Sequence, residues 1–141
     1  MSQADVDVVL DQFTGVNERD FKRAMDGYAD DVVLVVPGEG IQSGTFEGKQ
    51  AVGEWFGDWF RTFDRDYRFE IEEARQLPEG PILVLARHGG RGRLSGAEVR
   101  GENAYLYRIR DGRISRVGFY ATREEALQAA SLPEWSGAET N

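Results

Sequence analysis

The hydrophobic positions in the first half of the chain recur at three- and four-residue intervals, which is typical of amphipathic helices. Three such stripes occur, and their apolar members are Val6, Val9, Leu10 and Phe13, then Phe21, Ala24, Met25 and Tyr28, then Val52, Trp55, Phe56, Trp59, Phe60 and Phe63. Ser2 and Asn17 are expected to cap the first two helices, Gly15 to end the first, and Gly48 to begin the third. The sequence therefore predicts three helices before residue 64.

Between the second and third stripes the pattern changes to that of a strand. The segment YADDVVLVVPGEG, residues 28–40, places Asp30 and Asp31 before five consecutive apolar residues. A run without alternation predicts a strand buried on both faces, and Pro37 with the following glycines ends it. The two acids are expected at the junction of helix and strand.

The second half of the chain follows strand periodicity. Extended segments are expected at 43–46, 67–72, 82–94, 98–110 and 113–121, and Asp111-Gly112 is a hairpin signal between the last two. Thr122 and Glu125 form a capping box for a final helix that ends at Leu132. We therefore expect one α+β domain over residues 1–132, followed by a flexible tail over 133–141. Its curved, mostly antiparallel sheet would wrap around the N-terminal helices and enclose a cavity.

Composition narrows the functional classes. The net charge is −8, and an acidic chain repels phosphate backbones, so nucleic-acid binding is not expected. There is no cysteine and one histidine, which is poor material for a metal site. No apolar run is long enough to span a membrane, and no cofactor fingerprint occurs. We expect a cytoplasmic protein without metal or cofactor.

Several segments together resemble a known family. A second helix ending in YADDV, the strand that stops at Pro37, and the segments GTFEGKQAVGEWF, YLYRIRDGRISRV and YATREEALQAASL follow one another. This order is similar to SnoaL-like members of the nuclear transport factor 2 superfamily, which also includes ketosteroid isomerases and limonene-type epoxide hydrolases. The resemblance covers nearly the whole chain. It implies a cone-shaped α+β barrel with an interior cavity, usually dimeric, but fold alone does not determine function.

The acids used by the family's enzymes are absent at the matching positions. Val36 stands where ketosteroid isomerases carry a catalytic Asp before the proline, and Tyr105 stands where SnoaL-type cyclases carry a His. Phe119, Tyr120 and Thr122 occupy the stretch where the cyclases have an acid. The Arg-x-Asp triplet of the epoxide hydrolases does not occur.

The remaining chemical candidates lie on two strands. Period two places His88 on the same face as Ile82, Val84 and Ala86. A neutral imidazole there could act as a base or bind a ligand, or it could simply be a histidine satisfied at the end of a strand. Asn103, Tyr105 and Tyr107 share one face of the next strand. They could stabilise a carbonyl or enolate oxygen, or only cover the sheet.

We therefore predict one pocket for an apolar, oxygenated ligand, lined by Tyr28, Trp55, Trp59, Asn103 and Tyr107 together with the candidate catalytic residues His88 and Tyr105. The alternative for the tryptophans is ordinary core packing. Two functions remain open: a cofactor-free cyclase, isomerase or hydrolase that transfers protons, and a non-catalytic ligand-binding or accessory protein. A homodimer is expected through the outer face of the sheet, carrying Glu102, Leu106, Arg108, Arg110 and Arg116.

Overall fold

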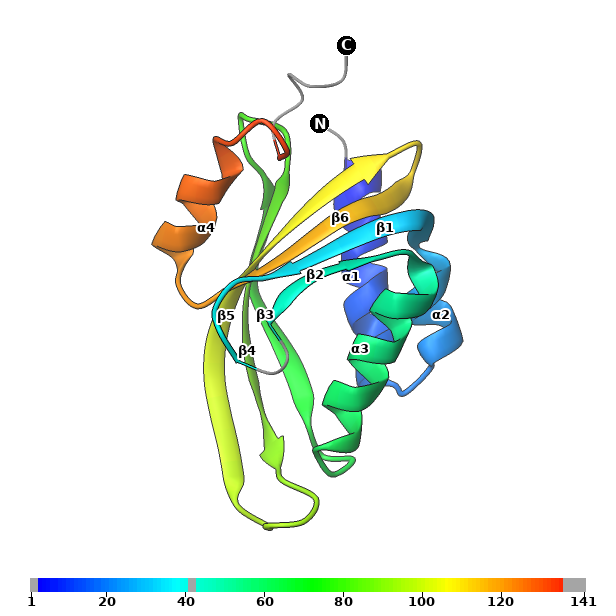
Figure 1. Ribbon diagram of the computed structural model, residues 1–141, viewed down its shortest axis with the longest axis vertical. Coiled ribbons are helices and arrows are strands. Elements are labelled where there is room, and N and C mark those ends of the chain that lie inside the picture. Colours follow the sequence, from blue (N-terminus) through cyan, green and yellow to red (C-terminus); the bar gives the residue numbers. More distant parts are fainter. Residues whose placement is uncertain (1–2, 41–42, 136–141) are drawn as a thin grey trace.

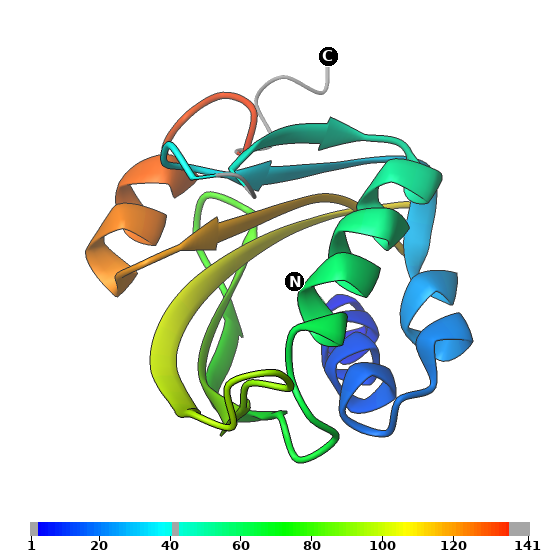
Figure 2. The same cartoon turned by 60° about the horizontal axis from the view of Figure 1, so that its bottom comes forward.

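Three helices from the first half of the chain lie in the concavity of a curved six-stranded sheet, and a fourth helix lies against the opposite face (Figures 1 and 2). The computed structural model describes residues 3–40 and 43–135, and the counts refer to them. The helices are α1 (Gln3–Asn17), α2 (Phe21–Asp26), α3 (Lys49–Arg61) and α4 (Arg123–Ala130). The strands are β1 (Tyr28–Val36), β2 (Gly44–Glu47), β3 (Arg68–Gln76), β4 (Ile82–Arg91), β5 (Glu98–Arg110) and β6 (Arg113–Tyr120). The α+β fold class is as predicted.

The sheet has the order β2-β1-β6-β5-β4-β3. Strands β3 to β6 form an antiparallel meander, β2 pairs antiparallel with β1, and β1 joins β6 in parallel. The edge strands β2 and β3 do not pair with each other in the described residues, so the curved sheet stays open. The hairpin between β5 and β6 turns at Asp111 and Gly112, which have φ values of 54° and 77°, as a type I′ turn requires.

The strongest sequence signals predict these elements correctly. The aromatic stripe forms α3, which begins directly after Gly48, and the strand expected at 98–110 has those bounds. The Thr122 hydroxyl accepts a hydrogen bond from the Glu125 amide at 3.1 Å and begins α4, which ends at Ala130 rather than Leu132. Local capping and turn chemistry therefore agrees with the tertiary fold at these points.

The boundary between the first two helices and β1 differs from the prediction. Gly15 lies inside α1, and the side chain of Asp20, not Asn17, caps α2. Asn17 instead bonds the backbone N–H and C=O of Phe69 at 2.8 and 2.9 Å. The expected cap Ser2 lies outside the described residues. A Cβ at Gly15 would lie 2.9 Å from the Ala24 nitrogen, so this glycine permits the close approach of the two helices.

Strand β1 starts earlier than its sequence suggests. Tyr28 is its first residue, not the end of a helix, and the exposed acids Asp30 and Asp31 lie within the strand. Asp31 accepts a hydrogen bond from Arg110 at 2.7 Å, which gives it a surface role. Val32 and Leu34 are fully buried, whereas Val33 and Val35 are only partly covered. The strand is therefore less evenly buried than the apolar run predicts.

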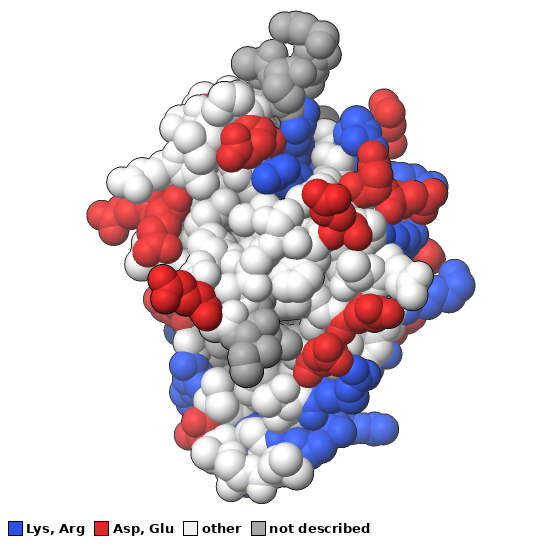
Figure 3. Space-filling view, viewed as in Figure 1, with Lys and Arg blue, Asp and Glu red and all other residues white. Residues whose placement is uncertain are grey.

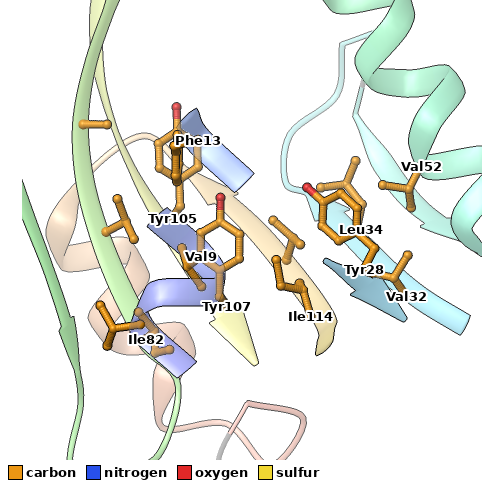
Figure 4. Close-up of a cluster of buried hydrophobic side chains, with 14 of the residues drawn as sticks. Val9, Phe13, Tyr28, Val32, Leu34, Val52, Ile82, Tyr105, Tyr107 and Ile114 are labelled. Atoms are coloured by element: carbon orange, nitrogen blue, oxygen red, sulfur yellow. The ribbon is translucent and has the colours of Figure 1, made fainter. Parts of the chain in front are cut away.

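Apolar side chains pack on both faces of the sheet. The inner cluster joins α1, α3 and the concave face, with Val9, Phe13, Tyr105 and Tyr107 at its centre (Figure 4). The outer cluster joins α4 to Leu83, Leu106 and Tyr120 and includes Trp135. In the described residues, no helix is long and apolar enough to cross a membrane.

The outer cluster changes the surface expected for a dimer. Leu106 is fully buried beneath α4 and Trp135, so it is not available to a second subunit. Arg116 lies over the Trp135 ring at 5.3 Å from its centroid, and Arg108 donates to the Glu134 carbonyl at 3.0 Å. Packing thus continues past Pro133 as far as Trp135, inside the segment expected to be a tail. Residues 136–141 lie outside the described residues, and the homodimer stays a prediction.

Candidate functional site

A cavity of about 310 Å³ lies between the concave face of the sheet and the helices α1 and α3. Its polar lining side chains include Gln12 from α1 and Asn103, Tyr105 and Tyr107 from β5. The other lining residues are Phe13, Val16, Val36, Pro37, Gly40, Ser43, Trp55, Phe56, Trp59, Phe60, Tyr67, Phe69, Phe119, Tyr120 and Ala121. The cavity is therefore built from segments that span most of the chain.

The walls are mainly aromatic because α3 presents its rings to the sheet. Trp55 and Trp59 stack with centroids 5.7 Å apart and planes inclined by 5°. Phe119 meets both Trp55 and Tyr105 edge to face, at 5.2 and 4.8 Å. Such contacts prefer defined geometries. The cavity therefore has rigid, flat walls suited to a ring-shaped ligand.

The structure brings five of the seven predicted site residues to this cavity. Trp55, Trp59, Asn103, Tyr105 and Tyr107 line it, and the alternation along β5 places its three members on one face. Tyr28 and His88 are not among its lining residues. Tyr28 and His88 therefore lie outside the pocket that the sequence predicted for them.

Tyr28 lies in the core behind the cavity wall. Its ring stacks on Phe56 at 6.1 Å, and it is fully buried. Figure 4 shows it among Leu34, Val52 and Ile114, apart from Tyr105. Its hydroxyl has no hydrogen-bond partner within residues 3–40 and 43–135, and burial raises its pKa. Tyr28 supports the wall rather than forming it.

His88 contacts the cavity through another residue. Its Nδ1 lies 2.9 Å from the hydroxyl of Tyr67, a lining residue that also accepts a hydrogen bond from Trp59 Nε1 at 3.3 Å. Gly101 faces the imidazole, and a Cβ there would lie 2.8 Å from His88 Nε2. Burial lowers the pKa of His88, and a hydrogen bond with Asn103 partly opposes this. The imidazole is therefore mainly neutral at pH 7.

Gln12 is a cavity residue that the sequence analysis missed. It is 4% exposed, and its Oε1 accepts a hydrogen bond from the Tyr107 hydroxyl at 3.3 Å. A signal existed, because Val9, Gln12 and Phe13 have the spacing of one helix face. A polar residue within an apolar stripe is an informative exception.

The Tyr105 hydroxyl is a hydrogen-bonding group of the cavity that remains available to a ligand. It forms no hydrogen bond with the described residues, although its ring is held by Phe13 and Phe119. Burial, with a smaller effect of Tyr67, raises its pKa, so the phenol stays protonated at neutral pH. Figure 4 shows the hydroxyls of Tyr105 and Tyr107 pointing in the same direction.

The cavity lacks strong acids and bases. Of its described lining residues, none carries a carboxylate, imidazole, amine or guanidinium. Val36, Phe119 and Tyr120, where the resemblance would place catalytic acids or their neighbours, line the cavity with apolar or phenolic side chains. No group of three acids or histidines converges as a metal site would require within the described part of the chain. The arrangement can bind and orient a neutral ligand.

Comparison with known proteins identifies the family. Residues 9–117 match the SnoaL-like domain, and this segment contains most of the cavity and five of the six strands in full. The chain belongs to the SnoaL-like family. The SnoaL-like chain is also 28% identical over 119 residues to the uncharacterised protein Rv0034 of Mycobacterium tuberculosis, covering 84% of this chain and 89% of that protein.

Solved structures show the same NTF2-like fold at low sequence identity. Bal32a, from a soil-derived mobile gene cassette, gives a TM-score of 0.77 at 13% identity and covers 90% of this chain and 95% of its own. TerC, co-crystallised with polyporic acid, gives 0.73 at 18% identity, with coverages of 89% and 97%. Rv0760c of Mycobacterium tuberculosis, in complex with estradiol-17β-hemisuccinate, gives 0.73 at 19% identity, with coverages of 87% and 97%.

Proposed function

We propose that this SnoaL-like chain binds an apolar, ring-sized molecule with a carbonyl or hydroxyl oxygen in the aromatic cavity. The cavity volume of about 310 Å³ and the stacked Trp55 and Trp59 suit a compact ring system. The ligands in the TerC and Rv0760c structures, polyporic acid and an estradiol ester, are oxygenated ring compounds, which supports this ligand class.

The observation that carries the proposal is the free Tyr105 hydroxyl in an otherwise aromatic wall. The Gln12 carbonyl is already engaged by Tyr107, so its amide N–H groups are a second source of donors. Neutral donors in a mainly aromatic cavity bind a carbonyl oxygen without the cost of burying a charge. Binding followed by release, rather than chemistry, is the function that this donor set supports best.

A matched pair of ligands tests this proposal. Quenching of tryptophan fluorescence would give the affinities of 2-acetylnaphthalene and of 2-isopropenylnaphthalene, in which a methylene group replaces the carbonyl oxygen. Tyr105→Phe should weaken ketone binding about 5- to 10-fold, the usual effect of one lost hydrogen bond, and leave hydrocarbon binding unchanged. Tyr28→Phe, which removes a hydroxyl outside the cavity, is the control. Equal losses for both ligands, or no binding of either, would contradict the proposal.

Proton-transfer catalysis is the second candidate, and the contact between Tyr67 and His88 favours it. Because His88 does not line the cavity, it would act through Tyr67. A proton next to the ligand carbonyl would pass to the Tyr67 oxygen while the Tyr67 proton passes to His88 Nδ1, and Tyr105 would donate to the resulting enolate oxygen. This would be the chemistry of a cofactor-free isomerase or cyclase.

Deuterium uptake separates the two candidates. In D₂O, the acetyl methyl signal of 2-acetylnaphthalene would disappear from the proton NMR spectrum if the protein catalysed enolisation. His88→Gln should then abolish the exchange while the affinity changes little. If the native protein binds the ketone without accelerating exchange, binding alone is the function.

A further inference from the structure

A second hollow lies on the side of α3 that faces away from the cavity. It has a volume of about 570 Å³ and lies between α2, α3 and the loops that follow α3 and β4. Phe56 and Phe60 line both this groove and the inner cavity. Its other lining residues are Arg19, Phe21, Met25, Gly53, Gly57, Arg61, Phe63, Asp64, Arg65 and Arg93. We call it the outer groove.

The floor of the outer groove is apolar and smooth. Phe21 is 42% exposed there, and Gly53 and Gly57 lie one turn apart on α3. A Cβ at these glycines would lie 3.4 Å from Met25 Cε and 3.5 Å from Arg61 Nη1, which is ordinary contact. Alanine would therefore fit within the chain, and each glycine costs the helix about 0.5–1 kcal/mol relative to alanine. Packing within the chain therefore does not require glycine at either position.

Positive charge collects at one end of this floor. Arg19, Arg61, Arg65 and Arg93 line the groove, and Asp64 is the one acid among its described lining residues, in a chain with a net charge of −8. Figure 3 shows basic side chains gathered at the lower right of the molecule, near the C-terminal end of α3 in Figure 1. This end of the groove is an electropositive exception on an acidic protein.

Three of these guanidinium groups form no ion pair with an acid in the described part of the chain. Arg19 donates to the carbonyls of Val16 and Tyr67, and Arg93 donates to the carbonyl of Phe63, which are neutral partners. Neither these two nor Arg65 forms an ion pair with a described acid, whereas Arg61 pairs with Asp58. Burial, and then repulsion from Arg68 and Arg65, lowers the pKa of Arg19. An anion placed here would relieve like-charge crowding.

We infer that the outer groove binds a linear alkyl carboxylate, with its carboxylate between Arg65 and Arg93 and its chain along Gly57 and Gly53. By the rise of an α-helix, the floor from Gly53 to Arg61 is about 12 Å long, which suits a medium-length acyl chain. A neutral alkane would leave the arginines without an ion-pair partner, whereas a carboxylate would provide one. The site is separate from the inner cavity and does not depend on its function.

Decanoate is the test ligand, followed by two-dimensional amide NMR. Its addition should shift the amide signals of Gly53, Gly57 and Arg65. Decanol, which has the same chain without the charge, should bind at least about tenfold more weakly. Gly57→Leu should fill the floor and weaken decanoate binding by a similar factor. Arg65→Glu should do the same, whereas Arg113→Glu, an equal charge reversal at the exposed end of the β5–β6 hairpin, should not.

Three results would overturn the inference. Decanoate could shift the signals of Gln12 and Tyr105 instead, which would assign it to the inner cavity. Decanol and decanoate could bind equally, which would remove the role of the arginines. Sedimentation could show a dimer that Gly57→Leu dissociates, which would assign the groove to a second copy of the chain. A ketone that still binds to Gly57→Leu would show that the inner cavity is intact in the variant.

Discussion

At the scale of single residues, the number of available protons decides what each polar group can offer a ligand. The Tyr107 hydroxyl has one proton and gives it to Gln12. The Tyr67 oxygen accepts from Trp59 and lies against His88, so its capacity is largely used within the protein. Tyr105 alone among these three tyrosines keeps an uncommitted proton, within the contacts of the described residues. Under the proposed function, recognition of a ligand oxygen would therefore depend mainly on the Tyr105 hydroxyl.

The pH dependence of stability should reveal the environment of His88. Its pKa is lower in the folded protein than the ordinary value of 6.5. Between these two pKa values the unfolded chain binds more protons, so stability present above pH 6.5 is lost as the pH falls toward the folded pKa. Urea unfolding at about pH 7.5 and 5.5 should show a larger loss for the native protein than for His88→Gln. Equal losses would contradict the lowered pKa.

Residue patterns predicted which face of a strand a side chain lies on better than they predicted what its terminal atoms contact. Alternation placed Asn103, Tyr105 and Tyr107 on one face, and all three line the cavity. The same rule could not show that the imidazole of His88 turns toward Tyr67, because that depends on a contact across 21 residues. Nor could it show that Phe56 separates Tyr28 from the cavity. Contacts between distant segments decide these details.

At the scale of elements, the C-terminal segment acts as a cover for the outer face of the sheet. Helix α4 supplies Ala126, Ala129 and Ala130 to the outer cluster, and Trp135, 2% exposed, completes it. Gly118 permits this contact, since a Cβ there would lie 2.7 Å from the Trp135 ring. The tryptophan therefore holds a segment that sequence alone suggested was loose.

Removing this cover should destabilise the whole protein. Trp135→Ala should lower the free energy of unfolding by about 3 kcal/mol, as expected for loss of a buried tryptophan. Leu94→Ala is the matched control, because Leu94 is 100% exposed on the β4–β5 hairpin, and it should change stability by less than about 0.5 kcal/mol. Urea unfolding curves would measure both. If Trp135→Ala left the free energy of unfolding unchanged, the prediction of a flexible tail from Pro133 would stand.

Elements with their own local signals were predictable, and those set by neighbours were not. The hairpin at Asp111-Gly112 and the cap at Thr122 need only a few adjacent residues. Helix α2 has six residues, too few to be stable alone. Its end is decided by β1, because Tyr28 joins the sheet opposite Ile114. For that reason the helical spacing in the sequence extends to Tyr28, two residues past the end of α2 at Asp26.

At the scale of the whole molecule, α3 separates two spaces of different character. Its rings form the wall of a neutral cavity on one side, and its glycines form the floor of an electropositive groove on the other. Phe56 and Phe60 line both spaces, so a ligand that moves either ring on one side also changes the wall of the other space. If both proposals hold, one domain would bind two chemically distinct ligands on opposite sides of α3.

The parallel pairing of β1 with β6 has a consequence for folding kinetics. Leu34 lies opposite Val117, roughly 80 residues later in the chain, and closing so long a loop is slow and comes late. The β5–β6 hairpin should form first. Gly112→Ala, at a φ of 77°, should therefore mainly slow folding, whereas Val32→Ala in β1 should mainly speed unfolding. Stopped-flow measurements in urea would separate the folding and unfolding rates. If Val32→Ala mainly slowed folding and Gly112→Ala mainly sped unfolding, β1 would pair with β6 before the antiparallel meander forms.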